Sequence, residues 1–166
     1  RWAAAKGMIV VNSAGNEGSA KATTICAPCD ADSILCVGSV DANKQYHSMS
    51  SVGPTATGKI KPDVTAMGAN AACISDAGYI TFTSGTSLSS PLIAGLAACL
   101  KQANPQRSGW EIMRAITVSA NHLNHPDNFY GYGVPDACRA DSLLRTYNGI
   151  SPTQAELKKR IQLYPT

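Results

Sequence analysis

Ser87 is the side chain of this sequence whose type and setting best suit a nucleophile. It follows Gly85 and Thr86 in a tight turn and opens a long stretch with apolar residues at helical spacing. The N–H groups at a helix start, and the positive end of the helix dipole, stabilise negative charge that develops beside an oxygen placed there. The same setting is also typical of a serine that only caps the helix, and helix chemistry alone favours that simpler role.

Asn16 is the second residue whose setting suits chemistry. It lies in a loop of small residues, 13–18, directly after an apolar run. A neutral amide donor fixed on a short loop can stabilise an oxyanion that exists mainly in a transition state. The loop pattern by itself equally describes a turn asparagine that tolerates left-handed backbone, and taken alone it favours that role.

The elements that must position these two residues begin with strands. Residues 8–12 and 33–40 are short, continuous, β-branched apolar runs, which predict strands covered on both faces, as in a parallel sheet. Residues 63–66 and 71–74 are shorter strand candidates, and the alternation in 78–84 predicts part of a hairpin.

Helices follow these strands along the chain. Apolar spacing predicts a helix over residues 87–102, and Ser108 with Glu111 forms a capping box that opens a helix to about Ser119. Asp136 caps a helix that runs to about Tyr147, and a further capping signal at Ser151 opens an amphipathic helix. The order of elements predicts an α/β fold in which a mostly parallel sheet is flanked by helices.

The composition is that of a soluble globular chain with one core. It has 166 residues, and its net charge of +3 is too small and too dispersed to indicate nucleic-acid binding. No apolar run approaches the roughly 18 residues of a membrane span. Residues 1–7 read as the end of a helix without an N-cap, from which we expect further sequence upstream.

The six cysteines leave three interpretations open. Their even number suits disulfides in an oxidising compartment, but they equally suit unpaired cysteines packed as small apolar groups. The third interpretation is a metal or redox site, because Cys26 and Cys29 form a C-x-x-C pair, although no second pair completes a zinc ribbon. Cys99 falls in the apolar stripe of the long helix, so we expect it in the core. We also expect Gly95 to let that helix approach a neighbour closely.

The segment around Ser87 resembles the nucleophile signature of the subtilisin-like serine proteases. Residues 85–91 match G-T-S-x-[AS]-x-P and are followed by Ala94 and Gly95, which match the family's downstream A-G. The resemblance implies that Ser87 is the acylated nucleophile. It also implies a three-layer subtilisin-like architecture.

A second segment matches the family independently. Residues 9–18 resemble its strand followed by A-G-N-x-G, in which the asparagine points its amide at the tetrahedral oxyanion. The resemblance therefore assigns Asn16 to the oxyanion hole. It also implies that Ser13, Ala14, Gly15 and Thr86 line the substrate cleft.

Further matches extend the resemblance over roughly residues 1–145. Residues 61–66 resemble K-P-D-V-x-A, and 130–133 resemble a Y-G-x-G stretch before the last helix. We therefore expect residues 1–149 to be the C-terminal part of a subtilisin-like catalytic domain, and 150–166 to be a helical extension. Met67 stands where the family usually has proline. Residues 26–36, with three cysteines, fall where the family builds one wall of its S1 pocket, which puts substrate specificity in doubt.

The family's other catalytic residues have no match here. Its aspartate and the histidine of H-G-T-x-x-A precede the oxyanion asparagine, and nothing like them occurs in this sequence. We interpret His47, His122 and His125 as surface-loop residues and Asp63 as structural. Because a serine without an adjacent base is a weak nucleophile, the chain needs an upstream half for normal turnover.

The resemblance also indicates what the protein acts on and with. It implies a serine endopeptidase with polypeptide substrates, leaves room for a propeptide, and favours a secreted or periplasmic location. No cofactor or metal site is assigned. Family members often bind calcium, but no acidic cluster here marks a site. The alternative is a non-catalytic relative that binds peptides or proteins. A nucleotide-binding module is disfavoured, because no G-x-G-x-x-G or Gly-Lys-Ser/Thr motif is present.

Overall fold

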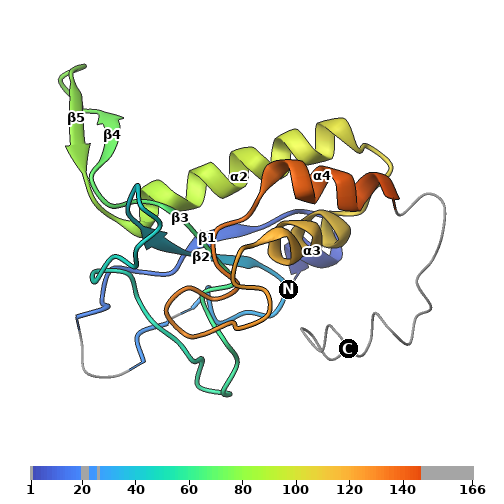
Figure 1. Ribbon diagram of the computed structural model, residues 1–166, viewed down its shortest axis with the longest axis horizontal. Helices are drawn as coiled ribbons and strands as arrows, with labels where there is room; N and C mark the ends of the chain where they lie inside the picture. Colours follow the sequence, from blue (N-terminus) through green and yellow to red (C-terminus); the bar gives the residue numbers. More distant parts are fainter. Residues whose placement is uncertain (1, 20–22, 26, 147–166) are drawn as a thin grey trace.

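The computed structural model describes residues 2–19, 23–25 and 27–146 of the chain (Figure 1). These residues form two sheets and four helices. In chain order the elements are α1 (Trp2–Ala5), β1 (Val11–Ser13), β2 (Leu35–Val40), β3 (Val64–Met67), β4 (Ala71–Ile74), β5 (Ile80–Thr83), α2 (Thr86–Ala103), α3 (Gly109–Ser119) and α4 (Ala137–Thr146).

The main sheet is parallel, with strand order β1-β2-β3. Val11 pairs with Leu35, and Val37 pairs with Val64. All six residues of β2 are buried, which confirms the prediction of a strand covered on both faces. The first strand begins at Val11 rather than Met8, because only Val11–Ser13 run beside β2.

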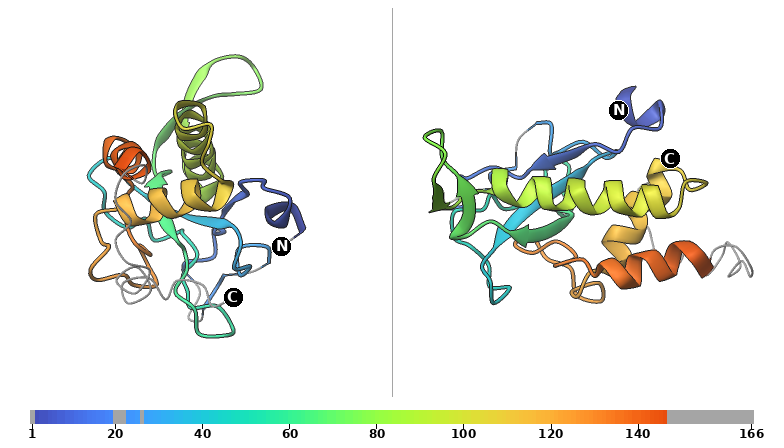
Figure 2. Two further views of the ribbon diagram at one scale, coloured as in Figure 1. Left: turned by 90° about the vertical axis from the view of Figure 1, so that its right-hand side faces the viewer. Right: turned by 90° about the horizontal axis from the view of Figure 1, so that it is seen from above.

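Helix α2 lies across all three strands of the main sheet (Figures 1 and 2). Its buried residues Ile93, Ala97 and Leu100 meet strand residues such as Val37 and Val64 in one hydrophobic core. Helices α3 and α4 pack against each other and against α2, and they add further apolar side chains to the same core. The α/β architecture expected from the order of elements is confirmed.

The predicted helix boundaries are close to those observed. Ser108 accepts the backbone N–H of Glu111, whose carboxylate accepts the N–H of Ser108, so the capping box at α3 is confirmed. The carboxylate of Asp136 accepts the N–H of Arg139 at the start of α4. The helix expected after Ser151 lies outside the described residues. None of the helices described here is long and apolar enough to cross a membrane.

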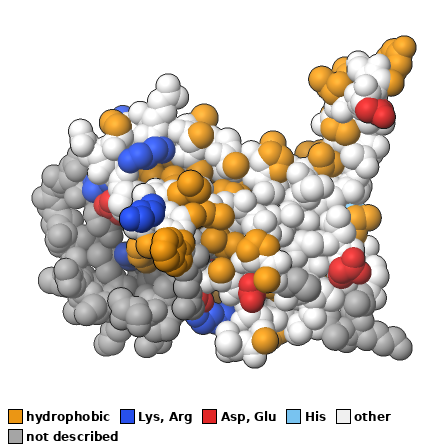
Figure 3. Space-filling view, turned by 180° about the vertical axis from the view of Figure 1, so that it is seen from behind, with side chains coloured by type: hydrophobic (Ala, Val, Ile, Leu, Met, Phe, Trp, Pro, Cys, Tyr) orange, Lys and Arg blue, Asp and Glu red, His pale blue; other side chains and the backbone are white. Residues whose placement is uncertain are grey.

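Strands β4 and β5 form an antiparallel hairpin that projects from the body of the molecule (Figures 1 and 3). Ile74 pairs with Ile80, and Ala72 pairs with Phe82. Because side chains alternate along a strand, these four share one face of the hairpin. Strand β5 leads through Ser84 directly into the start of α2.

Two expectations from the sequence, one for Cys99 and one for Gly95, are wrong. Cys29 and Cys36 form a disulfide, whereas Cys73, Cys99 and Cys138 are unpaired. Cys99 is exposed rather than in the core, because it lies on the side of α2 opposite Ala97 and Leu100. A Cβ added at Gly95 would meet nothing within 4 Å, so this glycine makes no close approach to another described element.

Candidate active site

The segments that carry Asn16 and Ser87 meet at the carboxyl edge of the main sheet. The loop with Asn16 follows β1 directly, and Gly68 follows β3. The backbone N–H of Gly85 donates to the carbonyl of Gly68, which fixes the start of α2 above this edge. In open α/β sheets, ligands bind outside the carboxyl ends of the strands, so this is the expected place for a site.

The loop after β1 is held by contacts that require glycine. Gly15 has a φ of 108°, a backbone conformation that side chains rarely allow, and an added Cβ would lie 2.7 Å from the Ser51 hydroxyl. Ser51 in turn donates its backbone N–H to the Gly15 carbonyl, and its hydroxyl accepts the N–H of Glu17. The loop is therefore fixed on both sides of Asn16.

Thr86 determines which way the Asn16 amide points. The Oδ1 atom of Asn16 accepts the backbone N–H of Thr86 at 2.9 Å and its hydroxyl at 3.0 Å. The Thr86 hydroxyl also accepts the N–H of Gly15 at 3.2 Å. With Oδ1 taken up by these donors, Nδ2 is the end of the amide that remains to donate to a ligand.

Ser87 lies in the first turn of α2 but does not cap it. The N-cap position belongs to Gly85, which has no side chain to cap the helix, and Asn16 Oδ1 instead accepts the N–H of Thr86, the first residue of α2. The first turn contains no acidic residue. Among the described residues nothing accepts the backbone N–H of Ser87, so this donor and the helix dipole are available to an anion.

The side chains of Ser87 and Asn16 border one space beside Gly85. A Cβ built on Gly85 would lie 3.1 Å from Ser87 Oγ and 3.5 Å from Asn16 Nδ2. The hydroxyl and the amide thus face one point from opposite elements, with no side chain between them. Ser87 and Asn16 are both exposed, so a ligand can reach these two residues, whereas Gly85 itself is buried. From the sequence, Gly85 is expected to let a substrate backbone approach closely, and this role stays a prediction.

The other predicted site residues differ in how far they are exposed to solvent. Ser13 and Gly15 are half-buried, whereas Ala14 is 4% and Thr86 1% exposed. The Thr86 side chain therefore supports Asn16 from beneath rather than forming open surface. A role for these four residues in substrate binding stays a prediction.

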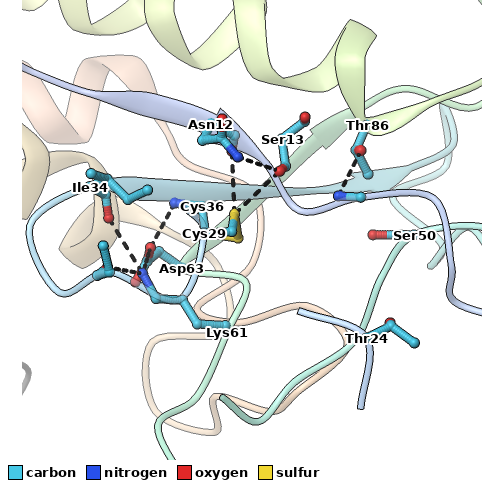
Figure 4. Close-up of a disulfide and its surroundings, with 12 residues drawn as sticks. Asn12, Ser13, Thr24, Cys29, Ile34, Cys36, Ser50, Lys61, Asp63 and Thr86 are labelled. Atoms are coloured by element: carbon cyan, nitrogen blue, oxygen red, sulfur yellow. Dashed lines mark hydrogen bonds and ion pairs between the residues drawn. A yellow bond between two sulfur atoms is a disulfide. The ribbon is translucent and has the colours of Figure 1, made fainter. Parts of the chain in front are cut away.

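The disulfide lies beside the end of β1 (Figure 4). Cys29 Sγ approaches the carbonyl oxygen of Ser13 at 3.3 Å and that of Asn12 at 3.7 Å. Cys29, Cys36 and Ala14 form a small buried cluster apart from the main core. The segment that the resemblance assigns to the wall of the S1 pocket is thus tied to the end of β1.

No described histidine hydrogen-bonds to the Ser87 hydroxyl. His122 packs against the ring of Tyr130, and His47 is half-buried with an Nδ1 atom that has no partner.

Asp63 is buried and forms an ion pair with Lys61 at 2.6 Å. Burial, and then the nearby Asp63 carboxylate, raise the pKa of Tyr132.

A model of the subtilase family, Peptidase_S8, matches residues 1–133. The chain belongs to the subtilase family. Subtilisin DY of Bacillus licheniformis is 36% identical over 130 residues, covering 78% of this chain and 44% of the relative. Serine protease AprX of Bacillus subtilis is 33% identical over 158 residues, covering 82% of this chain and 35% of the relative.

A solved subtilase-like structure has the same fold. The crystal structure of MycP1 from the ESX-1 type VII secretion system matches with a TM-score of 0.65 and 27% identity, covering 82% of this chain and 42% of that one. The mouse membrane-bound transcription factor site-1 protease is 28% identical over 174 residues, or 97% of this chain and 16% of the relative. The subtilase chain described here thus spans less than half the length of each of these relatives.

Proposed function

We propose that this subtilase chain is the serine-bearing half of a serine endopeptidase. Ser87 Oγ attacks the carbonyl carbon of a peptide bond and forms an acyl-enzyme as the leaving amine departs. A histidine from an upstream half takes the serine proton and returns it to that amine. Asn16 Nδ2 and the Ser87 backbone N–H donate to the oxyanion.

One observation carries the proposal. Ser87 Oγ and Asn16 Nδ2 lie 3.1 and 3.5 Å, respectively, from the position that a Cβ on Gly85 would occupy. A carbonyl group whose carbon faces Ser87 can direct its oxygen toward Asn16 only when both groups border one space. The Thr86 contacts that fix Oδ1 leave Nδ2 as the donor in that space. Membership of the subtilase family supports the same roles.

The partner that completes the site, in this proposal, is the upstream half of the catalytic domain. Strand β1 is one of the two edge strands of the main sheet, so one row of its backbone groups has no strand beside it among the described residues. Next to it lies a hollow of about 440 Å³, lined by residues such as Ile9, Val11, Ala94 and Ala98. An added strand with apolar side chains would pair with β1 and fill this hollow.

A pair of substitutions on α2 tests this docking surface. Ala98→Glu places a charge in the hollow and is expected to prevent assembly with the upstream half. Ala103→Glu makes the same change at an exposed position at the end of the helix, outside the hollow, and is expected to leave assembly intact. Co-purification of the two halves is the measurement. If both variants bind the upstream half equally well, the upstream half does not contact this hollow.

The proposed location is secreted or periplasmic. A disulfide between buried cysteines persists in oxidising compartments and is rare in the cytosol. Mass spectrometry of the natural protein would test this by determining whether Cys29 and Cys36 are joined.

The activity is tested in the full reading frame, which supplies the upstream half. We expect hydrolysis of unfolded polypeptides that is lost on treatment with a phenylmethylsulfonyl reagent and in the Ser87→Ala variant. Full activity in Ser87→Ala would refute the role of Ser87. Binding of peptides without hydrolysis by the wild-type protein would favour a non-catalytic relative instead.

A further inference from the structure

The β4–β5 hairpin has an apolar face that stays exposed in the described part of the chain. Ile74 is 76% exposed, Ile80 77% and Phe82 63%. With Ala72, these side chains lie on one side of the two strands, here called the hairpin face. Figure 3 shows apolar side chains along the projecting hairpin. Single apolar residues on a surface are ordinary, but a contiguous apolar patch is typical of a surface that binds a partner.

The hairpin also lacks the features that normally keep a sheet edge unpaired. Strands β4 and β5 form a sheet of their own, so each has one edge without a neighbouring strand among the described residues. Exposed edges usually carry charged residues or proline, which prevent pairing with another chain. Residues 71–74 and 80–83 contain neither, and Asp76 in the turn is the one charged residue between 69 and 85. An extended, uncharged chain can therefore pair with a hairpin edge while its apolar side chains contact the hairpin face.

The base of the hairpin belongs to the candidate active site. Gly68 lies between β3 and β4, and its carbonyl accepts the N–H of Gly85 beside Ser87. Phe82 precedes Gly85 by three positions and Ile80 by five, or roughly 10 and 17 Å along an extended strand. A polypeptide whose scissile bond lies beside Gly85 can therefore reach the hairpin face with residues about three to six positions from that bond.

Two other occupants fit the hairpin face less well. In the proposed function the upstream half adds to β1, whereas the hairpin follows β3, the opposite edge strand of the main sheet. A second copy of the chain would bury too little area. The three large side chains expose on the order of 400 Å² together, so two stacked faces would bury about 800 Å², less than the roughly 1,200 Å² of a stable interface. A substrate that binds transiently at the site needs no such area.

We propose that the hairpin face extends the candidate active site and binds apolar side chains of an extended, unfolded polypeptide several residues from the scissile bond. The inference rests on the proposed peptidase function and adds a substrate class to it, namely unfolded segments rich in apolar residues. Short peptides end before the hairpin face and bind only at the site itself. Because the hairpin face touches none of the reacting atoms, its loss raises KM and leaves kcat unchanged.

The test measures hydrolysis by the assembled enzyme from the full reading frame. Two long fluorogenic peptides share their central residues, but beyond the third residue on either side of the scissile bond one carries leucine and valine and the other serine and threonine. A tetrapeptide anilide is the short substrate. The double variant Ile80→Thr/Phe82→Thr keeps the strand preference of both positions. It should raise the KM of the apolar peptide by about tenfold and leave the kinetics of the polar peptide and the tetrapeptide unchanged.

Tyr79→Thr is the matched control. Tyr79 is 75% exposed, and its carbonyl accepts the N–H of Ser75, which continues the hairpin ladder by one residue. Because side chains alternate, Tyr79 lies on the side opposite the hairpin face. The control should change none of the three KM values by more than about twofold. An equal rise in the KM of the apolar peptide in both variants would overturn the proposal, as would an equal rise for the polar and apolar peptides.

Peptide binding to the Ser87→Ala form separates this inference from the peptidase role. The apolar peptide, carrying a fluorophore, should bind this form about tenfold more tightly than it binds the form that also carries Ile80→Thr/Phe82→Thr. Such binding without hydrolysis by the wild type would refute the peptidase role and support the hairpin face as a peptide-binding surface. Hydrolysis of the tetrapeptide, with binding that does not depend on the hairpin, would refute the present inference alone. Sedimentation of a dimer that dissociates in the double variant would also overturn it, because the occupant would then be a second copy.

Discussion

The side-chain oxygen of Asn16 accepts two hydrogen bonds from Thr86, a residue 70 positions further along the chain. One comes from the backbone N–H and the other from the hydroxyl. This contact joins the loop after β1 to the first turn of α2 and leaves Asn16 Nδ2 directed at the space beside Ser87. The two residues to which we assign the oxyanion donor and the nucleophile in the proposed function are thus positioned by one shared contact.

The donor role of Asn16 can be separated from its contact with Thr86. Asn16→Asp keeps an oxygen for the Thr86 donors but replaces Nδ2 by a negatively charged oxygen. In the assembled enzyme we expect kcat to fall by about 10²–10³ with little change in KM, the magnitude known for loss of the oxyanion donor in subtilisin itself. Asn16→Leu should lower kcat at least as far and should also lower the Tm, because the Thr86 N–H loses its acceptor. A kcat in Asn16→Asp within a factor of three of wild type would contradict the donor role.

Thr86 is predicted to act through Asn16. Thr86→Val removes the hydroxyl that donates to Asn16 and accepts from Gly15, while keeping the shape of the side chain. We expect kcat to fall by about tenfold, since the loss of the hydroxyl's hydrogen bond to Asn16, worth roughly 1.5 kcal/mol, loosens the amide. Thr86→Ser keeps the hydroxyl and should retain most of the activity. If Thr86→Ser and Thr86→Val lose the same activity, the methyl group rather than the hydroxyl is what matters.

Gly85 is predicted to be required for activity rather than for folding. Its φ of 162° is extended backbone that alanine also adopts, and the three atoms nearest to an added Cβ all belong to the side chains of Ser87 and Asn16. Gly85→Ala should therefore block the shared space and lower kcat/KM by at least about tenfold, at a nearly unchanged Tm.

Gly68→Ala is the contrasting substitution. There an added Cβ would lie 2.1 Å from the Ser89 hydroxyl and 2.7 Å from the Gly85 carbonyl, both under the start of α2. This variant should lose stability as well as activity. Thermal unfolding alongside kinetics separates the two cases, and a large loss of Tm in Gly85→Ala would show that its role is structural.

The capping box of α3 is predicted to weaken in acid. Burial by itself raises the pKa of Glu111, but hydrogen bonds from Ser108 and Arg107 outweigh it and hold the pKa below its usual value. The ionised carboxylate therefore stabilises the fold above the ordinary glutamate pKa, and this contribution disappears as the pH falls through the lowered value.

Glu111→Gln should accordingly lower the Tm at neutral pH by more than it does near pH 3, where the wild-type carboxylate is protonated. Glu17→Gln is the control, because no described residue donates a hydrogen bond to its carboxylate. A Tm difference between Glu111→Gln and wild type that stays constant with pH would contradict this account.

The local elements could be predicted from the sequence, because their signals lie within a few residues. The apolar spacing of α2, the capping box at Ser108 and the cap at Asp136 each gave a helix close to the observed one. The apolar run of β2 likewise gave a fully buried strand. Resemblance to the subtilases added the matched motifs around Asn16 and Ser87, and with them the expectation of one site.

Contacts between distant segments could not be predicted in the same way. The sequence does not tell which side of α2 meets the sheet, so Cys99 was expected in the core but is exposed. The link from Thr86 to Asn16 and the disulfide of Cys29 with Cys36 depend on how separate loops meet. Asp63 was interpreted as structural from the sequence, but only the fold reveals its ion pair with the buried Lys61, whose ammonium also donates to the carbonyls of Ala31 and Ile34.

Labelling by a fluorophosphonate probe tests the central claim most directly, since the probe forms a covalent bond only with an activated serine. The assembled protein should be labelled once, at Ser87, and the label should disappear in Ser87→Ala and persist in Ser89→Ala. Peptide mapping by mass spectrometry identifies the modified residue. Labelling at another serine, or none in an assembly that hydrolyses peptides, would contradict the assignment of Ser87 as the nucleophile.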